Sequence, residues 1–257
     1  GDEALRARCH DAGLARAAEL TWDAAAERLV GVWSDVLRER PQPRRAVRPV
    51  AAGRSASVVA AITSTGQADD VPAAIEGLRG QGLGDDLTVV VVANRPGDGT
   101  VELVRADYPD CVLVEQPDTR SYAENQAVAF AAAPGDYLAI VNPDAVAQPG
   151  CLAALVAFME AHPRCGVVAP VLRNLDGSYQ EAARRFPEPV GSAIRRTPLR
   201  RVLPPERHAA DHYLGEPTAA RPVDWSLGAF LLIRRAAWDD VGGFDEAFAP
   251  LYVEEIE

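Results

Sequence analysis

The sequence predicts a doubly wound α/β fold, in which a mostly parallel sheet carries helices on both faces and follows a short helical segment. The first observation is that short runs rich in β-branched residues alternate with segments of helical periodicity from Ser57 onward. The second is that these runs are almost continuously apolar, which is typical of strands buried on both faces. Strands that alternate with crossover helices form a parallel sheet. With 257 residues, 48% of them hydrophobic, the chain is long enough for one large core of this class.

Strands and helices are predicted in alternating order. The predicted strands are SVVAAI, LTVVVVA, CVLVE and YLAIV, and the predicted helices begin after Asp69-Asp70, at about Thr100, and within SYAENQAVAFAAA and CLAALVAFMEAH. Ligands of such sheets bind at the carboxyl ends of the strands. The turn NPD, which ends at Asp144 and directly follows YLAIV, is therefore expected to place a carboxylate where a ligand would lie.

Three segments are expected along the chain. Residues 1–40 are predicted to be helical, because apolar residues recur there at helical spacing. Residues 41–56 are rich in Pro, Arg and Ala without periodicity, which indicates a linker. Residues 57–257 then form the α/β domain. The chain starts at Gly1 and stops at LYVEEIE, which has the character of a helix opening, so we expect a fragment of a longer polypeptide with a truncated last domain.

Composition narrows the classes of function. The net charge is −11, so a nucleic-acid partner is not expected. No apolar stretch reaches the roughly 20 residues of a membrane helix, and the N-terminus lacks the layout of a secretion signal. We therefore expect a cytoplasmic protein, and a peripheral contact with the inner face of the membrane is left open. The 4 cysteines are scattered without the spacing of a zinc site or a disulfide framework.

Four ordered motifs carry a resemblance to a known family. They are VVVVANRPGDGTVELVRADYPD, GDYLAIVNPDAVAQPG, DGSYQEAARRFPEP and VDWSLGAFLLIRRAAWDDVGGFDEAFAPLYVEE. In this order they resemble the family-2 glycosyltransferases of the GT-A fold, in particular the bacterial rhamnosyltransferase-like members, over about residues 56–257. The resemblance implies an inverting enzyme that moves a sugar, with rhamnose as one candidate, from a nucleotide-diphosphate donor to a saccharide or lipid-linked acceptor.

The NPD turn resembles the family's metal-binding element. Asn142 matches its first position and Asp144 its last, whose carboxylate in the family helps to hold Mg²⁺ or Mn²⁺ on the donor diphosphate. Hard oxygen ligands suit these cations, and a metal neutralises the charge on a departing diphosphate. Taken alone, Asn-Pro-Asp is also a common turn former, which is the alternative interpretation.

The YVEE motif resembles the family's general-base element. The family has a Glu-Asp pair there, and the Asp takes the proton from the acceptor hydroxyl. This chain has Glu254 and Glu255, so the resemblance implies that Glu255 is the base, with one extra methylene in its side chain. A helix start that is enriched in acidic residues is the alternative.

The resemblance also implies donor contacts at two strand ends. Thr63 and Thr65 match nucleotide-contacting positions after the first strand, and Asn94 and Asp98 match positions after the second. Ordinary caps and turns are the alternative for these residues. The family has Asp before the Asn to accept the imide N–H of a pyrimidine base, whereas this chain has Ala93. Losing that acceptor would cost about 1–3 kcal/mol.

The motif DWSLGAFLL resembles the segment that lines the acceptor side. Asp224, Trp225 and Gly228 match its positions, and small residues there let a substrate approach the backbone. Trp225 is equally compatible with a core position. The Arg-rich stretch 183–222 has three interpretations: a flap over the diphosphate, a contact with an anionic lipid acceptor, or a solvated loop.

Two alternatives remain open. Residues 1–40 resemble the closing helices of a family-4 glycosyltransferase of the GT-B fold, which would make the parent a fusion of two transferases, and a plain helical extension is the alternative. For the α/β domain, the alternative to an enzyme is a degenerate GT-A domain that binds a sugar nucleotide or a partner protein without turnover. Ala93 and the pair Glu254-Glu255 favour that alternative.

Overall fold

The structure is a computed structural model in which residues 55–95, 97–186, 213 and 215–246 are described. The chain divides into two compact units, Gly1–Ala46 and Val47–Glu257, and every described residue belongs to the second. The predicted helical segment lies outside the described residues, as does the predicted linker up to residue 54.

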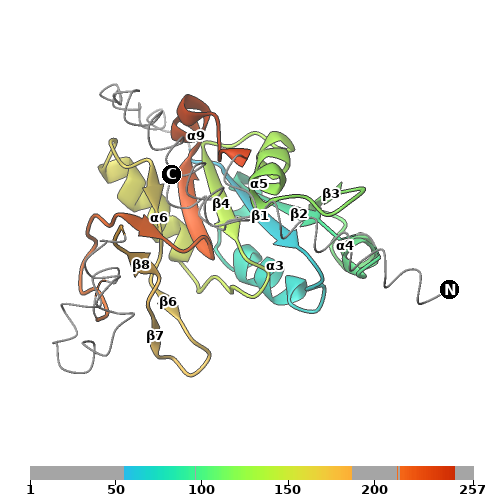
Figure 1. Cartoon of the computed structure of the whole chain (residues 1–257), viewed down its shortest axis with the longest axis horizontal. Coiled ribbons are helices and arrows are strands. Elements are labelled where there is room, and N and C mark those ends of the chain that lie inside the picture. The colour runs from blue at the N-terminus through green and yellow to red at the C-terminus, as the bar shows by residue number, and fades with distance from the viewer. Residues whose placement is uncertain (1–54, 96, 187–212, 214, 247–257) are drawn as a thin grey trace, which may run out of the picture. The chain divides into compact units, whose positions relative to one another are not determined.

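The second unit is built on a six-stranded sheet with the strand order β3-β2-β1-β4-β10-β5 (Figure 1). The strands are β1 (Val58–Ser64), β2 (Leu87–Ala93), β3 (Val112–Glu115), β4 (Tyr137–Val141), β5 (Val167–Val168) and β10 (Phe230–Arg234). The first four run parallel to one another, whereas β10 lies antiparallel between β4 and β5. The predicted, mostly parallel sheet is confirmed, and each of the four predicted apolar runs forms a strand.

Helices follow the parallel strands as the sequence predicts. They are α3 (Val71–Arg79), α4 (Thr100–Asp107), α5 (Tyr122–Ala131), α6 (Cys151–Ala161) and, after β10, α9 (Arg235–Val241). A short 3-10 helix, η1 (Gly84–Asp86), leads from α3 into β2. The crossover helices explain why the first four strands are parallel, since each helix returns the chain to the edge where the next strand begins.

Helices cover both faces of the sheet. On one face, Val58, Ala60 and Ile62 of β1 pack in a core with residues of α3, α4 and α6. On the other face, Val59 and Ala61 pack with residues of α5 and with aromatic residues of α9 and the segment after it. Successive residues of a strand point to opposite faces, and both sets are buried, so the apolar runs reflect burial on two sides.

The start of α5 shows how local sequence fixes a boundary. The Ser121 hydroxyl accepts a hydrogen bond from the Glu124 N–H over 3.2 Å, and the Glu124 carboxylate accepts one from the Ser121 N–H over 2.9 Å. This reciprocal pair is a capping box, which satisfies two backbone donors at the helix start. The hydrogen bonds from Ser121 lower the pKa of Glu124, so its carboxylate remains charged at neutral pH.

Two small antiparallel sheets lie between α6 and β10 in the sequence. They consist of β6 (Leu172–Arg173) with β7 (Tyr179–Gln180), and of β8 (Ala183–Arg184) with β9 (Trp225–Ser226). The second sheet joins the segment before residue 187 to the segment that enters β10. Trp225 and Ser226 are therefore already paired before the chain enters β10.

Candidate active site

The carboxyl ends of the parallel strands gather most of the predicted site residues at one edge of the sheet. Ser64, Ala93 and Glu115 are register partners at the ends of β1, β2 and β3, and Val141 ends β4 beside the first residue of β10. The loops that follow these strand ends carry Thr65, Asn94, Asp98, Asn142 and Asp144. This is the edge at which doubly wound sheets bind ligands.

The turn after β4 presents Asp144 to solvent. The Asn142 N–H donates to the Ala229 carbonyl over 2.9 Å, and the Ala145 N–H donates to the Asn142 carbonyl over 3.0 Å, which closes the turn. Pro143 is buried within this turn, whereas Asp144 is exposed. Across the described part of the chain, the Asp144 carboxylate has no hydrogen bond or ion pair to another side chain. The carboxylate is therefore available to a ligand.

Asn94 connects three of the loops at this edge. Its Nδ2 donates to Thr65 Oγ1 over 3.0 Å and to the Arg120 carbonyl over 3.2 Å, and its Oδ1 accepts from the Arg120 N–H over 2.8 Å. The side chain is only 3% exposed. Asn94 thus joins the loops after β1, β2 and β3, and its polar atoms are already engaged.

Asp98 holds the loop after β1 against the start of α4. Its two oxygens accept hydrogen bonds from the Gly66 N–H over 2.8 Å and from the Thr100 N–H over 2.9 Å. Burial alone would raise the pKa of this carboxyl, but the hydrogen bonds from Thr100 and Gly66 outweigh it and lower the pKa below its ordinary value. A charged Asp98 therefore fixes two glycine-containing turns in place.

Thr63 faces a buried amide on α5. Thr63 Oγ1 accepts a hydrogen bond from Gln126 Nε2 at 3.5 Å, and Gln126 is 1% exposed. The Gln126 Oε1 is the one buried side-chain acceptor left without a hydrogen bond in the described part of the chain.

Ala93, at the end of the neighbouring strand β2, is also buried. The carboxylate of its register partner Glu115 is ion-paired with Arg105 at 2.5 Å.

Each of the predicted acceptor-side residues is held by a hydrogen bond to another segment of the chain. Trp225 lies half-buried in β9, and its Nε1 donates to the Arg185 carbonyl over 3.0 Å. The Asp224 carboxylate accepts from the Phe186 N–H over 2.9 Å. Gly228 is buried, and its carbonyl lies 3.5 Å from the Tyr122 hydroxyl. These contacts place Gly228 at the carboxyl edge of the main sheet. Trp225 lies in β9, earlier in the chain, and Asp224 directly precedes it.

Several predicted residues cannot be placed at this edge. Glu254 and Glu255 lie outside the described residues, as do residues 187–212 of the Arg-rich stretch. Two of the arginines that are described, Arg185 and Arg221, have their guanidinium carbons 4.7 and 4.5 Å from the centroid of the Tyr213 ring. The proposed base therefore remains a prediction.

The side chains at the carboxyl edge of the sheet were compared with the ligands that a divalent cation needs. Within residues 55–246, as far as they are described, no three His, Cys, Asp or Glu side chains lie together as metal ligands. Asp144 by itself is one hard oxygen ligand. Mg²⁺ and similar cations commonly bind through one or two carboxylates together with substrate phosphates and water. The described residues thus fit a cation that is shared with a bound diphosphate.

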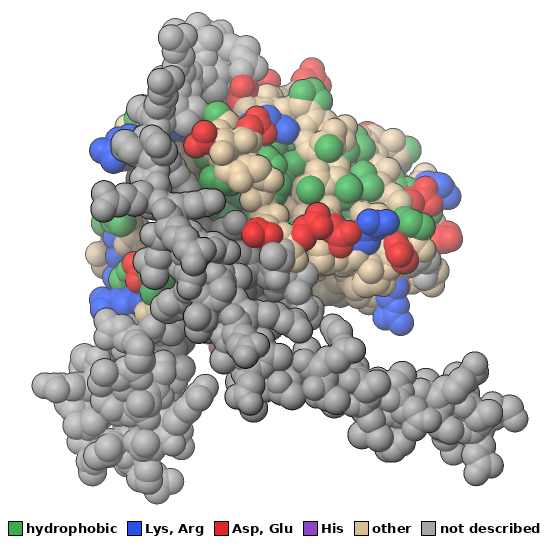
Figure 2. Space-filling model, turned by 45° about the horizontal axis from the view of Figure 1, so that its top comes forward, with side chains coloured by type: hydrophobic (Ala, Val, Ile, Leu, Met, Phe, Trp, Pro, Cys, Tyr) green, Lys and Arg blue, Asp and Glu red, His purple; other side chains and the backbone are tan. Residues whose placement is uncertain are grey.

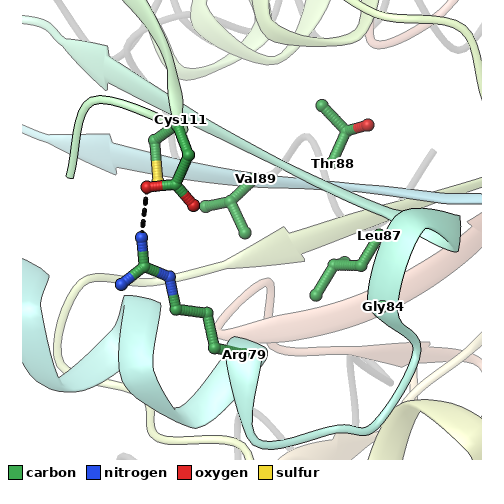
Figure 3. A pocket seen from close by; sticks show the side chains of 7 residues that line it. Arg79, Gly84, Leu87, Thr88, Val89 and Cys111 are labelled. Carbon is green, nitrogen blue, oxygen red and sulfur yellow. Dashed lines mark hydrogen bonds and ion pairs between the residues drawn. The ribbon is translucent and has the colours of Figure 1, made fainter.

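A shallow hollow lies at the opposite edge of the sheet and contains no predicted site residue. It is lined by the beginning of β2 and by residues near Arg79 and Cys111, and Figure 3 shows Arg79 reaching from α3 toward the segment that holds Cys111. Arg79 forms an ion pair there with Asp110. Burial raises the pKa of the Cys111 thiol, so it is not set up as a thiolate nucleophile.

The surface agrees with the acidic composition. On the described part of the face in Figure 2, acidic and basic side chains are interspersed and form no continuous basic patch. Among the described residues, no helix is both long enough and apolar enough to cross a membrane.

Comparison with known proteins identifies related chains. The model of the family "Glycosyl transferase family 2" matches residues 59–218. In two strains of Mycobacterium tuberculosis, N-acetylglucosaminyl-diphospho-decaprenol L-rhamnosyltransferase is 30% identical over 190 residues, which cover 66% of this chain and 59% of that protein. The chain therefore spans less than two thirds of the length of these relatives.

Solved structures share the fold at low sequence identity. The mannosyltransferase PcManGT of Pyrobaculum calidifontis, in complex with GDP-Man and Mn²⁺, aligns with a TM-score of 0.50 and 21% identity over 84% of this chain and 55% of that one. Residues 1–349 of S. aureus TarS, in complex with UDP, align with a TM-score of 0.53 and 14% identity over 77% of this chain and 53% of that one.

Proposed function

Because this chain belongs to glycosyl transferase family 2, we propose that it transfers a sugar from a nucleoside-diphosphate donor to a saccharide or lipid-linked acceptor, with inversion at the anomeric carbon. The observation that carries the proposal is the exposed Asp144 carboxylate, which has no partner side chain among the described residues and lies at the carboxyl edge of the sheet. A carboxylate in that setting contributes little to packing, so a ligand accounts for it better than stability does.

The proposed donor follows from what the fold relatives bind. The mannosyltransferase PcManGT was solved in complex with GDP-Man and Mn²⁺, and TarS in complex with UDP. These ligands share a nucleoside diphosphate and differ in the base. We therefore propose a nucleoside-diphosphate sugar for this chain and leave the base open, since Ala93 offers no carboxylate to a pyrimidine imide.

The proposed acceptor and sugar follow from the rhamnosyltransferase relatives. Their name specifies an acceptor in which N-acetylglucosamine is joined through a diphosphate to decaprenol, and a rhamnosyl group as the sugar transferred. We propose the same chemical class here, namely a polyprenyl diphosphate sugar as acceptor and rhamnose as donor sugar. An acceptor of this class resides in a membrane, so the protein would act in the cytoplasm with a peripheral contact at the membrane surface.

The residues at the edge would divide the work as follows. Thr63, Thr65 and Asn142 would contact the donor at the strand ends, while Asn94 and Asp98 fix the loops between them. When bound, Mg²⁺ or Mn²⁺ supplies positive charge that stabilises the departing diphosphate. Asp144 would hold that cation in place, so that the diphosphate is oriented before reaction.

The acceptor would approach from the other side of the edge. Gly228, which has no side chain, would let the acceptor approach the backbone, and Asp224 and Trp225 hold the segment that precedes it. Glu255, with Glu254 beside it, would take the proton from the acceptor hydroxyl as it attacks the anomeric carbon. Because both glutamates lie outside the described residues, this base rests on the sequence motif alone.

One experiment separates an enzyme from a binding domain. The chain is incubated with UDP-, GDP- and dTDP-linked sugars, Mn²⁺ and a synthetic N-acetylglucosaminyl diphosphate lipid, and products are followed by mass spectrometry. Transfer to the lipid supports the proposal. Tight donor binding with neither transfer nor hydrolysis would instead support a degenerate domain, an alternative that the buried Ala93 favours.

A further inference from the structure

Gln81, just beyond α3, bonds to the loop that follows Asp144. Its Nε2 donates to the carbonyls of Gly77, Gln148 and Ala147 over 2.8, 3.0 and 3.3 Å. Its Oε1 accepts from the Leu152 N–H over 3.0 Å. The side chain is 6% exposed, so water does not readily replace these bonds. One amide therefore joins the end of α3, the loop at residues 147 and 148, and the first turn of α6.

Gln81 supplies a cap that α6 lacks locally. The first backbone N–H groups of a helix have no partner within the helix and are usually satisfied by the side chain of the N-cap residue. The N-cap of α6 is Gly150, which has no side chain. Leu152 is the second residue of this helix, and Gln81 satisfies its N–H from 71 positions earlier in the chain.

The same surface of α3 fits the loop closely. A Cβ at Gly77 would lie 3.0 Å from the Ala147 nitrogen and 3.0 Å from Val146 Cγ1. Gly77 lies in the last turn of α3, and Gln81, two residues after the helix, bonds back to the Gly77 carbonyl over 2.8 Å. The absent side chain at residue 77 thus lets the loop rest directly on the helix, and Gln81 bonds it there.

Asp144 is consequently fixed from both sides. Two residues before it, the Asn142 N–H is bonded to the Ala229 carbonyl over 2.9 Å. Three residues after it, the Ala147 carbonyl is bonded to Gln81. The exposed carboxylate thus lies on a short turn between two anchors, Ala229 directly before β10 and Gln81 just beyond α3.

We propose that Gln81 is a positioning residue for the cation-binding turn: by bonding the loop at residues 147 and 148, it holds Asp144 where a cation shared with the donor diphosphate is bound. This inference rests on the proposed function. Groups that orient a metal ligand without touching the metal typically change metal affinity about 10–100-fold when they are removed. Loss of Gln81 is expected to weaken binding of the cation within that range, beyond its effect on stability.

The test uses the full chain and measures binding of Mn²⁺ in the presence of UDP or GDP. Free Mn²⁺ is followed by its electron paramagnetic resonance signal, and the melting temperature is measured in parallel. Gln81→Met removes every hydrogen bond of the amide at similar volume. Gln81→Glu keeps an acceptor for Leu152 and removes the amide donor to the loop. Both variants are expected to raise the dissociation constant of Mn²⁺ about 10–100-fold.

Tyr137→Phe provides the matched control for stability. It removes a buried hydroxyl that bonds Arg234 over 2.9 Å at the start of β4, the end of the strand away from Asp144. It is expected to lower the melting temperature and leave the Mn²⁺ constant unchanged. If Gln81→Met does not fold, Gly77→Ala displaces the loop instead while Gln81 is retained, and the same rise in the Mn²⁺ constant is expected.

The outcomes distinguish this inference from the proposed function. Gln81 variants that lose thermal stability like the control but bind Mn²⁺ as the wild type does would overturn the positioning role. Asp144→Ala tests the function itself, since it should abolish the shared binding of Mn²⁺ and nucleotide. If Asp144→Ala binds both normally, the cation is not held at this turn, and the role inferred for Gln81 is overturned together with the metal assignment.

Discussion

Asn94 Nδ2 donates a hydrogen bond to Thr65 Oγ1 over 3.0 Å, which joins the loop after β2 to the loop after β1. The remaining bonds of the same amide reach the backbone of Arg120, in the loop after β3. Because the side chain is buried, these bonds are protected from exchange with water. The loops proposed to receive the donor are thereby held together before any ligand arrives.

Replacing Asn94 is expected to affect both stability and donor binding. Asn94→Ala leaves the Arg120 N–H and the Thr65 hydroxyl without their partner, and an unsatisfied buried group costs about 1–3 kcal/mol. Urea unfolding followed by circular dichroism should show a loss of this size, together with weaker UDP or GDP binding in calorimetry. Asn174→Ala, at an exposed turn where the amide bonds Ser178 Oγ, serves as the control and should leave both unchanged. Equal unfolding midpoints for the two variants would contradict the bridging role of Asn94.

Asp98 is expected to make stability depend on acid pH. Its folded-state pKa is lowered, so its contribution to stability is present above the unfolded-state pKa of about 3.9 and is lost as pH falls through the folded-state value. Asp98→Asn removes this dependence and presents an amide N–H₂ to one of two backbone donors. The variant should be less stable than the wild type at pH 7, and the difference should shrink below about pH 4. A constant difference between pH 7 and pH 3 in urea titrations would refute this account.

Tyr137 is expected to make stability depend on alkaline pH. Burial is the largest cause that raises the pKa of its hydroxyl, followed by its hydrogen bond to Glu160. A raised folded-state pKa stabilises the protein below the unfolded-state value of about 10, and this contribution is lost as pH rises further. Tyr137→Phe should cost about 1–3 kcal/mol at pH 7, because Arg234 loses a buried partner. Thermal melts of the wild type and Tyr137→Phe at pH 7 and above pH 10 test this. A stability difference between the two proteins that is the same at both pH values would contradict the proposed role of the Tyr137 hydroxyl.

The strands were predictable because their signal is local. Continuous burial on two faces leaves a continuous apolar run, so YLAIV coincides with β4 residue by residue. The position of Asp144 at the carboxyl edge follows from its place directly after that run. The antiparallel placement of β10 between β4 and β5 was not predicted from strand patterns, because FLLIR forms a strand through partners far away in the sequence.

The polar contacts of the site could not be predicted from sequence patterns. Gln81 lies in GQGLGDD, where nothing local distinguishes it from a solvent-exposed loop residue, and its partners are 66 to 71 positions away except for Gly77. Asp98 matched its motif, yet the sequence left a turn and a donor contact as equal interpretations. The structure adds that both of its oxygens already bind backbone N–H groups.

Asp144 is proposed to hold a cation on the donor diphosphate, and sugar transfer by the Asp144→Ala variant of this chain measures that role. A metal stabilises such a leaving group by several kcal/mol, and each 1.36 kcal/mol is tenfold in rate. Turnover titrated with Mn²⁺ should therefore fall about 100-fold or more, with an unchanged melting temperature because the side chain is exposed. Asp85→Ala, an exposed carboxylate at the opposite edge, should retain full turnover. Wild-type turnover with unchanged Mn²⁺ dependence in Asp144→Ala would contradict the proposal that Asp144 holds the cation.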